Sequence, residues 1–92
     1  MVQFKVEYLT IHNNNITNEG GLYLADAFLG KKLIKQINLS MNFIRDQAVS
    51  YFCDSFLENL YPNLQCLTVT QNQISEKFKK FANSYFKDRI QL

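Results

Sequence analysis

The stretch Leu9–Ile16, with the sequence LTIHNNNI, decides the fold. An alternation of apolar residues runs directly into three asparagines and then returns to an isoleucine. Asparagine is a poor strand former and a middling helix former, so three in a row predict a loop. A similar pattern of residues recurs as INLSMNFI at Ile37–Ile44 and as LTVTQNQI at Leu67–Ile74. A recurrence of this kind indicates a repeat architecture.

The three copies share the spacing L-x-x-L-x-L-x-x-N-x-I. Its positions are Val6, Leu9, Ile11, Asn14 and Ile16; Ile34, Ile37, Leu39, Asn42 and Ile44; and Leu64, Leu67, Val69, Asn72 and Ile74. All fifteen hold an aliphatic residue or the asparagine, so chance is a poor explanation. The copies are offset by 28 and then by 30 residues, and the two extra residues fall near Tyr61-Pro62, a loop signal.

This pattern resembles a leucine-rich repeat, and a period near 28 with a long helical half resembles the ribonuclease-inhibitor-like subclass. The resemblance covers about residues 6–86. It implies an α/β solenoid, a short horseshoe segment with parallel strands on the concave face and helices on the convex face. It predicts one domain over residues 1–92, with repeats at approximately 6–33, 34–63 and 64–91. Leu92 lies 28 residues after Leu64, where a fourth repeat would start.

The asparagine of each repeat has a physical reason. The chain turns sharply after each short strand, and backbone N–H and C=O groups buried between stacked units need partners. An asparagine side chain offers both an amide and a carbonyl. We therefore expect Asn14, Asn42 and Asn72 to form a structural ladder, and the flanking Asn13 and Asn15 to be incidental loop residues facing solvent.

The segments after each asparagine have the signals of helices. Thr17 or Asn18, Asp46 and Ser75 are the expected N-caps. The phenylalanines of these helices favour the core, and Tyr85 is spaced for burial with them, although eight phenylalanines in so short a chain leave room for one or two at an interface. The phenylalanines of the helices are Phe52, Phe56, Phe78, Phe81 and Phe86. Phe78 departs from the pattern, because Gly20 and Ala48 stand at its place in the other repeats. A large ring there predicts a displaced third helix, or one without a normal following neighbour.

Composition narrows the function classes. A 47% hydrophobic content is too rich for a disordered chain, and a net charge of +2 gives no global field for nucleic acid or membranes. Cys53 and Cys66 form no CxxC motif, and two thiols in a small unstapled domain favour a reducing compartment. We expect no metal, no cofactor, no leader peptide and no membrane span. The expected location is intracellular and cytoplasmic, with cytoskeletal, ciliary or organellar complexes left open.

The side chains that alternate with the inward positions would form the concave face. They are Tyr8, Thr10, His12, Gln36, Asn38, Ser40, Cys66, Thr68 and Thr70, with Met41 and Phe43 beside them. Neutral hydroxyl and amide groups with a few large apolar ones suit a protein partner. Met41 and Phe43 are either binding anchors or loop packing. No nucleophile with an orienting acid is recognisable near His12, so we expect no enzyme and no small-molecule substrate.

The sequence thus predicts a protein–protein interaction or scaffold module, a small subunit or fragment of a larger intracellular assembly. Its terminal repeats lack polar caps, so partners are expected to cover one or both ends. One alternative is the regulation of an enzyme such as a small GTPase. Another is contact with RNA or a membrane surface through the basic C-terminal helix, although a solvated helix face is the simpler interpretation. The basic residues there are Lys77, Lys79, Lys80, Lys87 and Arg89.

Overall fold

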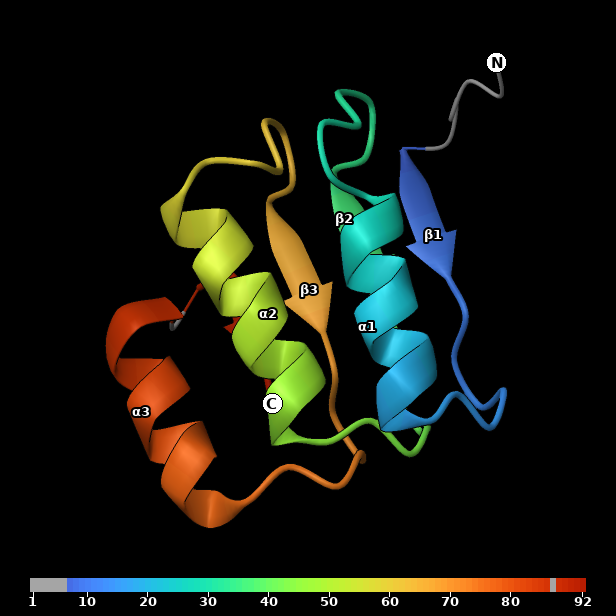
Figure 1. The fold of residues 1–92 in the computed structure, drawn as a ribbon, viewed down its shortest axis with the longest axis vertical. Coiled ribbons are helices and arrows are strands. Elements are labelled where there is room, and N and C mark those ends of the chain that lie inside the picture. The colour runs from blue at the N-terminus through green and yellow to red at the C-terminus, as the bar shows by residue number, and fades with distance from the viewer. Residues whose placement is uncertain (1–6, 87) are drawn as a thin grey trace.

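The computed structural model of the chain describes residues 7–86 and 88–92, so Val6 and Lys87 lie outside the described residues. The elements are β1 (Tyr8–Thr10), α1 (Asn18–Ala27), β2 (Gln36–Asn38), α2 (Asp46–Leu57), β3 (Cys66–Thr68), α3 (Glu76–Phe86) and β4 (Ile90–Gln91). In this described part, four strands form one parallel sheet in chain order, and three helices lie on one of its faces (Figure 1). The expected α/β class is confirmed.

The sheet register follows the sequence repeat. Tyr8 pairs with Gln36, and Gln36 pairs with Cys66, which reproduces the offsets of 28 and 30. The fourth strand differs, because Ile90 pairs with Leu67 and the strand therefore begins before Leu92. Residues 58–65 separate α2 from β3, whereas α3 ends at Phe86 and β4 begins at Ile90. The connection after α3 is shorter than the one after α2, so the last strand begins earlier in the sequence than a constant repeat length would place it.

The core fills the space between the sheet and the helices. Ile37, Leu39, Leu67 and Val69 point into it and are fully buried. The Tyr61 hydroxyl donates to the Ala25 carbonyl at 2.7 Å, which ties the loop after α2 to α1. These contacts make the first two helices and the sheet one packed unit.

The prediction for the aromatic residues is right for α2 and for Phe86, and wrong for Phe81 and Tyr85 of α3. Phe52, Phe56 and Phe86 are buried, as expected. Phe81 and Tyr85 are instead 50% and 70% exposed. They form a row with the half-buried Phe78, with ring centroids 5.7 and 5.3 Å apart. The three rings lie on one face of the helix, as their spacing predicts, but no element of the described chain covers them on the outer side of α3.

The helices do not approach one another equally. A Cβ atom at Gly21 would lie 3.0 Å from the Cβ atom of Ala48, so α1 and α2 are in close contact there. The corresponding residues of the next pair, Val49 and Phe78, are larger. A hollow of about 290 Å³ opens between the start of α2 and α3. We name it the α2–α3 groove; its lining residues are Asp46, Ser75, Lys77, Phe78 and Phe81.

The helix starts are linked across units. Thr17 Oγ1 accepts from the Gly20 N–H at 3.3 Å, and Ser75 Oγ accepts from the Phe78 N–H at 3.2 Å, so both expected caps are confirmed. The expected cap at Asp46 is wrong. Arg45 is the N-cap residue of α2, and the Asp46 carboxylate reaches forward to the N–H and hydroxyl of Ser75, at 2.8 and 2.6 Å. Asp46 serves the following helix because its side chain points to the next unit.

None of the helices in the described part of the chain is long and apolar enough to cross a lipid bilayer.

Candidate functional site: the open sheet face and its turns

Asn42 sits at the centre of the turns that support the sheet. Its Oδ1 accepts from the N–H groups of Asn14 and Ile16, both at 2.9 Å. Its Nδ2 lies 3.0 Å from the carbonyls of Ile11 and Leu39. The side chain is buried, and both its donor and its acceptor are used across two neighbouring units. Asn42 thereby fixes the distance between the first and second strands.

Asn72 repeats this arrangement one unit later, and Asn14 does not. Asn72 Oδ1 accepts from the Ile44 N–H at 2.9 Å, and its Nδ2 donates to the Leu39 carbonyl at 2.9 Å. Asn14 is exposed, and its Nδ2 donates to the His12 carbonyl of its own turn at 2.8 Å. The ladder therefore has two rungs between units, and Asn14 stands at its open end.

The backbone shows why asparagine stands on both sides of the ladder position in the first turn. The residue just before each ladder position is left-handed, with φ of 58° at Asn13, 60° at Met41 and 56° at Gln71. Asn15 has φ of 57°. Asparagine tolerates this conformation better than most residues with a side chain. Asn13 and Asn15 are exposed loop residues, as expected, but they are not incidental, because both are suited to the left-handed backbone of this turn.

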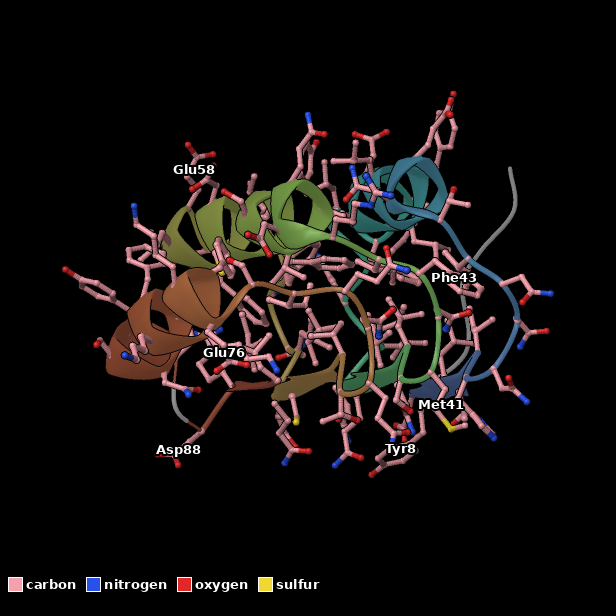
Figure 2. All side chains as sticks on the ribbon, turned by 90° about the horizontal axis from the view of Figure 1, so that it is seen from below. Tyr8, Met41, Phe43, Glu58, Glu76 and Asp88 are labelled. Atoms are coloured by element: carbon pink, nitrogen blue, oxygen red, sulfur yellow. The ribbon has the colours of Figure 1, made fainter. Side chains whose placement is uncertain are left out.

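Opposite the helices, the sheet has a bare surface, which we name the open sheet face. Figure 2 shows side chains, Tyr8 among them, projecting from the sheet on the side away from the helices. Its members are Tyr8, Thr10, Gln36, Asn38, Cys66, Thr68 and Gln91. Sequence reasoning missed Gln91, because the last strand was expected later. Its Oε1 accepts from the Thr68 hydroxyl at 3.3 Å, which marks it as a neighbour on this face.

The surface is shallow and partly preorganised. A hollow of about 160 Å³ runs over β1, β2 and β3. Asn38 Oδ1 accepts from the hydroxyl of Ser40 at 2.8 Å and from its N–H at 3.0 Å, which holds the amide in place. His12 and Ser40 follow β1 and β2, and Thr70 follows β3. The open sheet face thus offers ordered donors and acceptors rather than a deep pocket.

Met41 and Phe43 do not act as one patch. Met41 lies toward the sheet side of the molecule, whereas Phe43 lies toward the helices (Figure 2). Phe43 lines a separate hollow of about 390 Å³ at the helix starts, with Thr17, Asn18, Glu19, Arg45 and Gln73. The side chains of Met41 and Phe43 are 47% and 48% exposed. Only Met41 extends the open sheet face.

The two cysteines are free thiols in different surroundings. Burial, aided by the nearby Asp54 charge, raises the pKa of the Cys53 thiol to about 12. Cys66 is half-buried on the open sheet face, with its sulfur 3.9 Å from the Thr68 hydroxyl oxygen. Across residues 7–86 and 88–92, no three His, Cys, Asp or Glu side chains are grouped to hold a metal ion.

The basic residues at the C-terminal end are divided among several contacts. Lys79 Nζ lies 3.4 Å from the Glu76 carboxylate. The Arg89 guanidinium lies over the Phe56 ring, 4.2 Å from its centroid. Lys77 lines the α2–α3 groove and Lys80 is exposed. The expected basic cluster, without Lys87, is thus partly committed to contacts within the chain.

A scan against protein-family models gives no match, and no curated protein matches the chain in sequence. Function is therefore inferred from the surfaces of the chain itself.

Proposed function

We propose that the chain is a non-catalytic protein-binding module whose open sheet face contacts a protein partner within a larger intracellular assembly. One observation carries this proposal: in the part of the chain that the structure describes, the parallel sheet has helices on one face only (Figure 2). Parallel sheets in globular proteins are usually covered on both faces. A bare parallel face is therefore a surface that a second protein can cover.

The proposal includes the finer fold assignment, a short leucine-rich-repeat solenoid with the strands on its concave side and the helices on its convex side. Three features support it: the register offsets of 28 and 30, the asparagine rungs, and the capping of one helix by the unit before it. In solenoids each unit contacts chiefly its neighbours, so stability depends on such nearest-neighbour links. The same construction displays several strands side by side to one ligand.

The chemistry of the open sheet face favours protein over nucleic acid. Its seven members carry hydroxyl, amide and thiol groups and no charge. Phosphate recognition depends on Lys and Arg contacts that release counterions. Interfaces between proteins are instead enriched in tyrosine and methionine, and Tyr8 and Met41 supply both here.

The backbone at Met41 adds support. A left-handed conformation costs a residue with a β-carbon about 1 kcal/mol or more. Met41 adopts this conformation although its side chain is 47% exposed, so packing within the chain offsets little of that cost. Strained residues of this kind concentrate at functional sites. An exposed, polarizable side chain beside the polar sheet is suited to fill an apolar recess of a partner.

The experiment compares capture by two lysine variants. Thr10→Lys with Gln36→Lys places two charges on exposed positions of the open sheet face. Ala27→Lys with Asn83→Lys places the same two charges on exposed helix positions and is the matched control. Each protein is used to capture partners from its source cells, and the partner is then purified for a binding titration.

The proposal predicts that the sheet variant loses the partner and the helix variant keeps it. Desolvating two lysines at an interface built for neutral groups should weaken binding at least about a hundredfold. Equal binding of both variants would place the interface elsewhere and contradict the proposal.

A further inference from the structure

The charges on the helices are segregated. Within their bounds, α1 and α2 carry only acidic charged residues, namely Glu19, Asp26, Asp46 and Asp54. The first half of α3 carries three lysines, Lys77, Lys79 and Lys80, against the single acid Glu76. All three helices lie on the same side of the sheet, so one face of the molecule has an acidic part and a basic part (Figure 2).

Exposed apolar side chains lie where the two parts meet. On α3, the exposed rings of Phe81 and Tyr85 lie next to one another at a tilted angle, with their centroids 5.3 Å apart. The α2–α3 groove lies between the starts of the two helices and is lined by Phe78 and Phe81. Leu57, the final residue of α2, is 70% exposed at the other end of that helix. Large apolar groups beside complementary charges are typical of an interaction surface.

We propose that a second copy of this chain covers this surface. In the proposed dimer, the two-fold axis runs along the α2–α3 groove, parallel to the helices. Such an axis places α3 of each copy over α2 of the other and closes the assembly at two chains. The basic helix then faces an acidic helix twice, and the exposed rings of both copies meet at the axis.

Exposed residues of opposite charge lie on the two helices. Lys80 is in the first half of α3 and Asp54 is in the second half of α2, and both are exposed. In the proposed dimer, each Lys80 lies on the helix that faces Asp54 of the other copy, and the long lysine side chain can extend along the helix toward that carboxylate. The pair Lys80–Asp54 occurs twice in the dimer by symmetry.

A second copy suits this face better than a lipid surface or a nucleic acid does. Either of those would bring phosphates against the exposed carboxylates of Asp54 and Glu58 as well as against the lysines. A second copy instead presents acids to lysines and lysines to acids. The dimer uses the helical side and leaves the open sheet face free, so this inference is independent of the proposed function.

The test is the mass of the purified full chain, measured by sedimentation equilibrium over a concentration series. We expect a dimer. Lys80→Glu and Asp54→Lys should each weaken it about tenfold or more, because each puts like charges at both symmetric contacts. Combining the two substitutions restores opposite charges and should restore the dimer. Lys32→Glu, the same change at an exposed loop position, should have no effect.

A second pair of variants tests the apolar part. Phe81→Ser should give a monomer, whereas Tyr23→Ser, which removes an even more exposed ring from α1, should leave the dimer intact. Far-UV circular dichroism establishes that each variant is folded. A chain that is monomeric at every concentration overturns the inference, and so does a dimer indifferent to both charge reversals. Loss of a different protein partner from Phe81→Ser, with the chain itself monomeric, overturns it as well.

Discussion

The middle of the molecule and its two ends are built differently. In the middle, Asn42 and Asn72 use their amides to join neighbouring turns, and Gly21 lets α1 approach Ala48 closely. At one end Asn14 is exposed and bonds within its own turn, and at the other end aromatic rings of α3 are exposed. Within the described residues, the contacts between neighbouring turns and helices are therefore closest in the middle, and exposed amide and aromatic groups lie toward the ends.

The largest expected effect concerns the thiol in the middle. Because burial raises the pKa of Cys53 from 9.0 to about 12, its reactive thiolate is about a thousandfold scarcer near pH 8. In the Cys66→Ser variant, modification of Cys53 by a disulfide reagent should therefore be at least about a thousandfold slower in the native state than in urea. A native rate within about tenfold of the rate in urea would mean that α2 opens often and that the middle is not closed.

The same thiol links stability to alkaline pH. A pKa that is higher in the folded than in the unfolded state means that the folded state holds the proton more strongly. The contribution of Cys53 is complete below pH 9 and is lost as the pH rises toward 12. Cys53→Ala should flatten this part of the stability curve, relative to the parent chain, in urea unfolding at several pH values.

The second prediction compares two positions of the asparagine ladder. Asn42→Ala leaves the Asn14 and Ile16 N–H groups without their shared acceptor in a part-buried turn and removes a buried amide, and should lower the free energy of unfolding by about 3 kcal/mol. Asn14→Ala removes one exposed bond to the His12 carbonyl and should cost less than about 1 kcal/mol. Both are measured by urea unfolding with an unchanged m-value. Equal losses would mean that the end turn is as constrained as the middle one.

The third prediction uses two adjacent glycines of α1. A Cβ atom at Gly21 meets Ala48 Cβ at 3.0 Å and Ile44 Cγ1 at 3.3 Å, both in the core. A Cβ atom at Gly20 meets Ile16 Cγ2 at 3.0 Å, on a half-buried side chain that can move. Gly21→Ala should destabilise by about 1 kcal/mol, since overpacking of about 2 exceeds the helix-propensity gain of about 1. Gly20→Ala should be neutral or stabilising by up to about 1 kcal/mol. Thermal unfolding of both variants measures the two changes in stability. Stabilisation by Gly21→Ala would show that α1 and α2 separate readily.

Much of the middle could be predicted from sequence, because its constraints repeat. The recurring spacing gave the pairing of β1 with β2 and of β2 with β3, since stacked units must bury the same positions. It also assigned Phe52 and Phe56 to the core. Toward the ends, the recurring spacing does not determine which side chains are covered. Whether Phe81 is covered depends on what stands beyond α3, and periodicity holds no information on that.

Other features could not be predicted from the sequence, because they depend on how neighbouring units are placed relative to one another. Asp46 has the sequence signature of a cap for its own helix, but its carboxylate reaches Ser75 of the next unit. Gln91 was missed because the connection after α3 is shorter than its counterparts. The composition of the open sheet face could be foreseen from strand alternation. The separation of Phe43 from Met41 could not, because it depends on the path of a turn.

The smallest effect sharpens the comparison at the turns themselves. Asn13 at the end and Met41 in the middle share the left-handed conformation, with φ of 58° and 60°. Met41→Asn replaces a residue that this conformation strains by one that tolerates it, and should raise the free energy of unfolding by about 0.5 kcal/mol. Asn13→Met should lower it by a similar amount, and chemical denaturation of both variants measures the pair. If Met41 is kept at this strained position for binding, Met41→Asn must gain stability and lose affinity for the partner of the open sheet face. A Met41→Asn variant that gains both stability and affinity for the partner would show that the methionine has no binding role and is only tolerated by the turn.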